Sequence, residues 1–179
     1  MLDHYFKTLN SDLKTQGIAT PQLIVDDAAL QQNIQYIQTK LVQAEQLKPR
    51  LVVKSLASLN LLQLLSEKLN TQRFMVFHVP HIQLILENFT AVDLLLGKPT
   101  PAQAARTFYA QNSTWTKANI QWLIDTKERL LQYLEIAKDY AISLQVNIEI
   151  DVGLHRGGVQ SETKFAEMLS VIQQYPQYL

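Results

Sequence analysis

Residues 149–158 read Glu-Ile-Asp-Val-Gly-Leu-His-Arg-Gly-Gly and end a segment that is predicted to be a β-strand over residues 145–151. Three of the chain's five glycines surround one arginine here, Arg156. Glycine has no side chain, so it lets a backbone approach a bound group closely. A strand that runs into such a loop is a candidate cradle for a cofactor.

A lysine stands at the end of another predicted strand, about a hundred residues earlier. Lys54 closes the apolar run Leu51-Val52-Val53 and precedes residues 55–58, Ser-Leu-Ala-Ser. An amine at the carboxyl end of a buried strand is expected to be partly desolvated, which favours the neutral form that condenses with an aldehyde. The position therefore predicts a Schiff-base lysine. The alternative is a lysine whose apolar stem lies along the strand while its charge stays in water.

Composition narrows the class of protein. The 179 residues are 47% hydrophobic, which is enough for an ordinary domain core. Basic and acidic residues number 16 each, so the formal net charge is +0. The sequence has no excess of basic residues that would predict nucleic-acid binding. Without cysteine there is no disulfide framework or thiolate zinc site, and a cytoplasmic location is the default expectation. Residues 1–10 lack a continuous apolar core, so neither a signal peptide nor a membrane span is predicted.

Short apolar runs alternate with longer helical segments throughout. Strands are predicted at residues 22–25, 50–54, 73–77, 92–96, 120–124 and 145–151. Helices are predicted near residues 2–15, 27–43, 59–70, 80–88, 100–111, 127–141 and 161–174. This alternation predicts an α/β fold with a parallel sheet. Runs that are apolar on both faces, such as residues 73–77, predict strands covered on each side, as in a (β/α) barrel or a doubly wound sheet.

The chain resembles the fold-type III pyridoxal phosphate (PLP) enzymes. The nearest resemblance is to the D-threonine aldolase and D-serine dehydratase-like group, which shares its amino-terminal barrel with alanine racemase. The pattern Asp-x-Gly-x-x-Arg-x-Gly after a strand, at Asp151–Gly158, is its specific part. The other matching residues are Tyr5–Asn10, Thr20, Pro21, Asp26, Leu30, Asn33, Ile34 and Lys54.

The resemblance assigns two site residues. It implies that Lys54 binds PLP covalently and, once freed by the substrate, moves protons at the substrate Cα. It implies that Arg156 directs its planar guanidinium towards the phenolic oxygen of the cofactor. Residues 55–57, Ser-Leu-Ala, stand where the D-threonine aldolases carry a Thr-His-Lys-like stretch. The role of that histidine therefore does not transfer, and the substrate is left open.

Glu149 and Asp151 lie on the same side of the predicted strand, just before Arg156. In alanine racemases a carbamylated lysine at the position that corresponds to Glu149 orients the arginine. By resemblance, Glu149 is a candidate to supply that negative charge. The alternative, which the sequence supports equally, is that Glu149 is an ordinary glutamate in solvent or between strands. Asp151 is expected to satisfy backbone donors in the glycine loop rather than to carry protons.

The histidines suggest a competing chemistry. His78 and His81 follow a strand with a spacing that places two imidazoles on one helical face, which can bind a metal. Pro80 lies between them and no third ligand is near in sequence, so no metal site is assigned. By resemblance, any divalent metal would be held in a carboxyl-terminal part that this chain lacks. The sequence does not decide whether His155 contacts the substrate or packs within its loop. The pair Asp125-Thr126 is expected to cap the helix that begins at Lys127.

The expected fold is a partial PLP-binding (β/α) TIM-type barrel with about five of its eight parallel strands, preceded by a helix and a short strand. Residues 1–26 form the leading segment, and residues 27–179 the amino-terminal part of an alanine racemase-like barrel. The remaining barrel strands and a carboxyl-terminal domain are expected to be absent. The chain alone is therefore expected to be aggregation-prone or marginally folded, because its edge strands lack partners.

The resemblance implies a PLP-dependent lyase that cleaves or dehydrates a D-3-hydroxy amino acid, here as an incomplete chain. The alternatives are an alanine racemase-like isomerase and a non-catalytic PLP-binding protein. The expected partner is a small D-amino acid, with no nucleic acid and no membrane. A homodimer is expected for the full-length enzyme.

Overall fold

The computed structural model describes residues 2–55, 57–111 and 113–179, and it divides into two compact units, residues 1–36 and 37–179. Leu56 of the predicted 55–58 stretch lies outside the described residues. The division falls inside a helix, α2, so the boundary expected at residue 26 stays a prediction. No helix among the described residues has both the length and the apolar character that a membrane crossing requires.

The first unit contains α1 (Leu2–Thr15) and the beginning of α2 (Asp27–Gln43). Both helices have the bounds that periodicity predicts. The strand predicted at residues 22–25 is wrong, because this segment is irregular. Leu23, Ile24 and Val25 are exposed, and no described strand pairs with them. A short run of apolar, partly β-branched residues favours a strand, but an extended segment becomes one only when a neighbouring strand satisfies its backbone groups.

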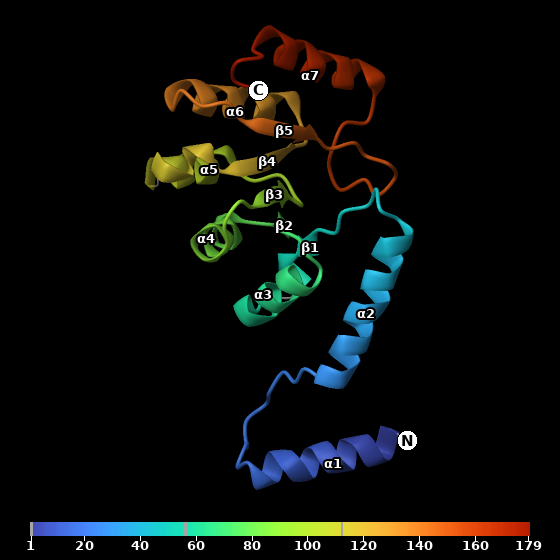
Figure 1. Cartoon of the computed structure of the whole chain (residues 1–179). Coiled ribbons are helices and arrows are strands. Elements are labelled where there is room, and N and C mark those ends of the chain that lie inside the picture. The colour runs from blue at the N-terminus through green and yellow to red at the C-terminus, as the bar shows by residue number, and fades with distance from the viewer. Residues whose placement is uncertain (1, 56, 112) are drawn as a thin grey trace. The chain divides into compact units, whose positions relative to one another are not determined.

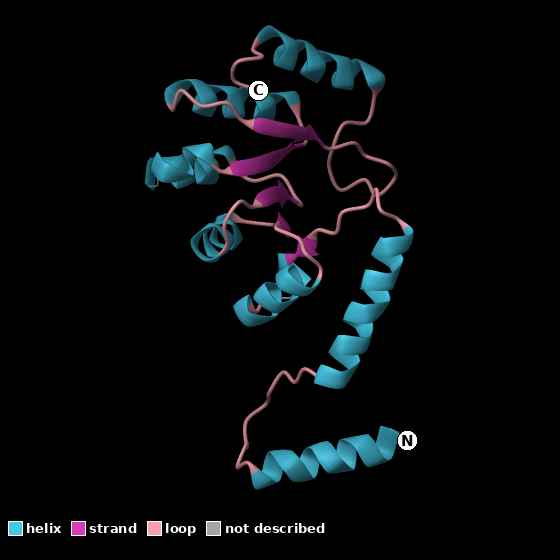
Figure 2. Ribbon diagram, viewed as in Figure 1, coloured by secondary structure: helices cyan, strands magenta, loops and turns pink. Residues whose placement is uncertain are grey.

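The second unit is built on a five-stranded parallel sheet in the order β1-β2-β3-β4-β5 (Figures 1 and 2). The strands are β1 (Leu51–Val52), β2 (Arg73–Val76), β3 (Asp93–Leu96), β4 (Asn119–Ile124) and β5 (Gln145–Ile148). The α-helices that follow them are α3 (Leu59–Lys68), α4 (Val79–Asn88), α5 (Ala102–Gln111), α6 (Lys127–Asp139) and α7 (Glu162–Gln174). Two short 3-10 turns, η1 (Val53–Ser55) and η2 (Ser113–Lys117), complete the unit.

Strand order decides between the two predicted sheet types. The strands follow one another in chain order, and α3 to α6 lie along the same side of the sheet (Figure 1). A doubly wound sheet reverses its strand order and carries helices on both faces. Successive parallel strands with helices on one side are instead typical of the wall of a (β/α) barrel. The predicted partial TIM-type barrel is confirmed.

The hydrophobic core lies between the sheet and its helices. Alternate strand residues, such as Phe74, Leu94 and Trp122, are fully buried there. The indole Nε1 of Trp122 donates a hydrogen bond of 3.0 Å to the hydroxyl of Tyr109 on α5, and burial raises the pKa of that hydroxyl to about 12. Residues on the opposite, inner face are only partly buried, among them Met75 and Leu95. The prediction that strands such as residues 73–77 are covered on both faces is therefore wrong for the described part of the chain.

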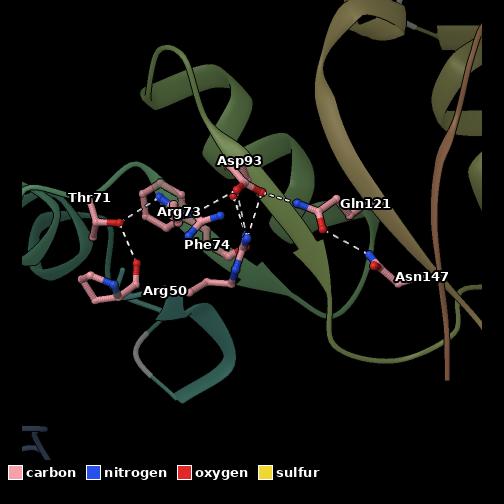
Figure 3. Close-up of polar contacts among 8 residues, drawn as sticks. Arg50, Thr71, Arg73, Phe74, Asp93, Gln121 and Asn147 are labelled. Atoms are coloured by element: carbon pink, nitrogen blue, oxygen red, sulfur yellow. Dashed lines mark hydrogen bonds and ion pairs between the residues drawn. The ribbon is translucent and has the colours of Figure 1, made fainter. Parts of the chain in front are cut away.

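The inner face is polar at the amino-terminal end of the strands (Figure 3). Asp93 accepts hydrogen bonds from Arg50 Nη2 at 3.0 Å and from Arg73 Nε at 2.9 Å. Gln121 Nε2 also donates to Asp93 at 2.6 Å, and Asn147 Nδ2 donates to Gln121 Oε1 at 3.2 Å. Partial burial alone would raise the pKa of Asp93, but the hydrogen bonds and charges of Arg73 and Arg50 outweigh it and lower this pKa. The network ties β2, β3, β4 and β5 together across the sheet.

We expect Asp93→Asn to lower the free energy of unfolding by about 3 kcal/mol, because it leaves two partly buried guanidinium groups without a counter-charge. The measurement is urea unfolding at neutral pH. Since the pKa of Asp93 is lower in the folded state, its contribution exists above the unfolded value near 3.9 and disappears as the pH falls through the folded value. The stability difference between wild type and Asp93→Asn should therefore shrink below about pH 4.

The control is Asp139→Asn, which removes the exposed ion pair with Arg106 and should lower the free energy of unfolding much less than Asp93→Asn does. An equal loss in both variants would show that the Asp93 network contributes no more than a surface ion pair does.

Candidate active site

The carboxyl ends of the strands surround a cavity of about 440 Å³. Lys54 follows β1 and Arg156 lies in the loop after β5, and both line this cavity. Two residues that are distant in sequence are therefore brought to one place, because parallel strands end at the same edge of a sheet. The full lining is Lys54, Phe77, Gly97, Lys98, Pro99, Asp125, Arg129, Glu149, Arg156 and Gly157.

Lys54 lies in the turn η1, directly after β1. Its side chain points into the cavity, and Nζ is 4.3 Å from the centroid of the Phe77 ring. The residue is exposed, so the partial desolvation predicted for it is not observed. The reason is that the inner face of the sheet is largely uncovered in the part of the chain that the structure describes. Its place at a strand end beside a cavity is as predicted.

The loop that carries Arg156 is organised by Asp151. The Oδ1 atom of Asp151 accepts from the backbone amides of Gly153 and His155, both at 3.0 Å. Its Oδ2 atom contacts His155 Nδ1 at 2.8 Å and Gln160 Nε2 at 3.2 Å. These bonds, led by the one from the Gly153 amide, lower the pKa of Asp151 to about 2. The expectation that Asp151 satisfies backbone donors is confirmed, and His155 contributes to loop packing.

Two glycines are required by the backbone of this loop. Gly153 and Gly158 have φ of +117° and +93°, a region that other residues avoid. A Cβ at Gly158 would lie 2.9 Å from the carbonyl oxygen of Glu149, which accepts a 2.8 Å hydrogen bond from Val159 N. Gly158 therefore lets the returning chain approach residues 149–151. Gly157 has ordinary room for a Cβ and faces the cavity.

We expect Asp151→Ala to speed hydrogen exchange of the Gly153 and His155 amides by roughly tenfold or more, because each loses a hydrogen bond to a charged acceptor. Hydrogen exchange followed by mass spectrometry on the peptide that covers the loop measures this. The matched control is Gln160→Ala, which removes only the 3.2 Å contact and should leave both amides protected. Unchanged exchange in Asp151→Ala would mean that other contacts hold the loop.

Arg156 and Glu149 share the cavity, but no ion pair joins them among the described residues. Arg156 is exposed, so its guanidinium is available to a ligand. The backbone of Glu149 is fixed by a hydrogen bond, in which its amide donates to Ile124 O at 2.8 Å. The idea that Glu149 orients Arg156 stays a prediction.

Sequence reasoning missed Arg129, which also lines the cavity. Its Nε forms a 2.7 Å ion pair with Asp125 at the end of β4, and its Nη1 donates to Thr100 O at 2.8 Å. It therefore fastens the loop after β3 to the end of β4. The four-residue spacing of Asp125 and Arg129 was a usable signal. The Thr126 hydroxyl accepts from Arg129 N at 3.2 Å, so the predicted cap of α6 is confirmed.

His78 and His81 lie together at the start of α4, with ring centroids 3.7 Å apart. Partial burial, and then the neighbouring His78, lower the pKa of His81. In the part of the chain that the structure describes, no group of three or more potential metal ligands occurs. The two rings are in contact and tilted by 35° to one another.

Comparison with known proteins gives a family and a fold. Residues 25–179 match the model of the family "Alanine racemase, N-terminal domain". A histidine racemase from Leuconostoc mesenteroides subsp. sake has a similar structure, with a TM-score of 0.66 and 16% sequence identity. An alanine racemase from Oenococcus oeni is similar with a TM-score of 0.64 and 17% identity. The match covers 82% and 81% of this chain, but only 38% and 41% of those proteins. No curated protein matches the chain closely enough to count as a relative.

Proposed function

The chain belongs to the family of alanine racemase N-terminal domains, and from this membership we propose that it supplies the lysine-bearing part of a PLP site in an enzyme that acts on a small amino acid. The observation that supports this most is that Lys54 and Arg156 line one cavity. The chain spans well under half the length of the two racemases that it resembles, so the whole activity is a proposal.

The residues present fit PLP. The cavity is large enough for a small cofactor and is lined by the amine of Lys54, the guanidinium of Arg156 and the small residues Gly97 and Gly157. An amine binds the aldehyde of PLP, and a planar guanidinium suits its anionic oxygens. Lys98 adds a further cation to the wall. When bound, the cofactor would supply an electron sink for negative charge at the substrate Cα.

In this proposal the chain's own residues position groups and move protons. Lys54 holds the cofactor and, when its amine is free, removes or returns the proton at the substrate Cα. Arg156 binds and orients the cofactor at its phenolic oxygen. The Asp151 carboxylate holds the loop on which Arg156 stands, through the amides of Gly153 and His155.

Racemisation of an amino acid is the reaction that we favour. Both named neighbours are racemases, which accords with the family assignment, although identities of 16% and 17% speak for the fold alone. The second candidate is a lyase acting on a D-3-hydroxy amino acid. The observation that favours it is the stretch Asp151–Gly158, which resembles the D-threonine aldolase and D-serine dehydratase-like group. We also propose that the full-length enzyme is a homodimer and that it is located in the cytoplasm.

The test is an assay in D2O of the chain expressed with any downstream coding sequence and supplied with PLP. Alanine enantiomers, D-threonine and D-serine are offered, and both deuterium at Cα and the products are measured. A racemase interconverts alanine enantiomers with deuterium uptake, whereas a lyase gives glycine from D-threonine or pyruvate from D-serine. Bound PLP without exchange or product from any of them would contradict both reactions and favour a non-catalytic PLP-binding protein.

A further inference from the structure

The amine of Lys54 has a structural partner in the same cavity. Its Nζ lies 4.3 Å from the centroid of the Phe77 ring. Among the described residues, no ion pair or side-chain hydrogen bond holds this ammonium. A cation above the face of an aromatic ring is attracted by the ring quadrupole. The contact therefore restricts where an otherwise exposed, flexible side chain points.

The ends of neighbouring strands bring this pair together. β1 and β2 are parallel with Val52 opposite Met75, and Lys54 follows β1 in the turn η1, where its Nζ reaches the ring of Phe77, the residue after β2. β2 and β3 have Met75 opposite Leu95, so Phe77 comes opposite Gly97. Gly97 N donates to Val76 O at 2.8 Å, which continues the ladder to this point. Phe77 therefore lies beside Lys54 on one side and beside Gly97 on the other, at the ends of three neighbouring strands.

Gly97 provides the space that the ring occupies. A Cβ at this position would lie 2.5 Å from two carbons of the Phe77 ring and 3.0 Å from Met75 Cγ. Real side chains do not approach so closely, so any residue other than glycine would push the ring away. The backbone of Gly97 does not have positive φ, and room for the ring is therefore the reason for glycine here.

We propose that Phe77 is a positioning residue for the Lys54 amine and that Gly97 makes its position possible, an inference that rests on the proposed function of Lys54. The ring holds the ammonium over the cavity before the cofactor attaches. Once the amine has reacted, the ring stays as an apolar wall of the same cavity. Phe77 does not exchange protons with the substrate, and its effect on the chemistry passes through the placement of Lys54.

The first test observes the contact without the cofactor. Lysines are reductively methylated with ¹³C, and the Lys54 resonance is identified by its absence from Lys54→Arg. Wild type and Phe77→Tyr, which keeps a ring face, should show this resonance shifted upfield by the ring current. Phe77→Leu and Gly97→Ala should return it to the position of exposed lysines. Phe89→Leu removes a ring that packs on Phe74 and should leave the shift unchanged.

The second test measures how fast PLP is trapped on Lys54 by borohydride. Phe77→Leu and Gly97→Ala should change the trapping rate roughly two- to fivefold, the factor that corresponds to a cation–π contact at an exposed site. Phe77→Tyr and Phe89→Leu should trap at the wild-type rate. Unshifted Lys54 resonances in wild type, or equal trapping rates in all variants, would overturn the proposal. A shifted resonance with no adduct on Lys54 would support the contact and count against the proposed function instead.

Discussion

Replacing Lys54 with alanine is expected to abolish covalent attachment of PLP and to lower turnover roughly a thousandfold or more. The variant loses both the covalent link to the cofactor and a proton-transfer group, and a positioned acid or base alone contributes about 10²- to 10⁴-fold. Turnover is measured on the PLP-loaded protein, and attachment by the absorbance of the bound cofactor. Lys54→Arg should behave in the same way, because it keeps the charge but cannot condense with an aldehyde.

The matched control is Lys117→Ala. Lys117 is exposed and precedes β4, at the opposite edge of the sheet from the cavity. This variant should bind PLP and turn over like the wild type. Circular dichroism of all three variants shows whether a loss is due to unfolding. Folded Lys54→Ala with normal turnover would remove Lys54 from the catalytic role.

Arg156→Ala should slow turnover by roughly tenfold or more while the protein stays folded. A hydrogen bond from a charged group contributes about 1.5–3 kcal/mol, and each 1.36 kcal/mol of barrier is tenfold in rate. Because Arg156 is exposed and makes no ion pair among the described residues, its loss should not weaken the fold. The measurements are turnover and the absorbance of the bound cofactor, which should shift if the guanidinium contacts the ring oxygen.

Arg106→Ala is the comparison for this variant. Arg106 lies on α5 in an exposed ion pair with Asp139 and is not among the residues that line the cavity. Its replacement should leave turnover and absorbance unchanged. If Arg156→Ala also leaves both unchanged, Arg156 is a surface residue and the cradle interpretation of residues 149–158 does not hold.

The sequence was sufficient to predict the elements that depend on local periodicity. The helices at residues 2–15 and 27–43 begin and end as predicted, since their signal lies within each segment. The shared cavity of Lys54 and Arg156 was also predictable, because parallel strands end at one edge. The parallel α/β sheet followed from a regular alternation of strands and helices, whereas the partial barrel was implied by the family resemblance.

The predictions that were wrong or missing concern features that depend on residues outside the local stretch of sequence. Residues 22–25 have a strand-like pattern but no neighbouring strand among the described residues. The inner face of residues 73–77 is only partly covered among the described residues, so the predicted coverage on both faces is wrong. The Arg50–Asp93–Arg73 network joins residues far apart in sequence, so no local pattern predicts it. The contact between Phe77 and Lys54, and the need for glycine at position 97, depend on how the ends of neighbouring strands meet, which no local pattern reveals.

Borohydride reduction of the PLP-treated protein, followed by peptide mapping, tests the central claim most directly. The account predicts one pyridoxyl adduct, on Lys54, the lysine that lines the cavity at the end of β1 and faces Phe77. Lys98 lines the same cavity, so its amine meets PLP at the same local concentration as the amine of Lys54 does. The yield of adduct on Lys98 is therefore the strictest comparison for the yield on Lys54. An adduct on Lys98 or on any other lysine, with Lys54 unmodified, would contradict the account.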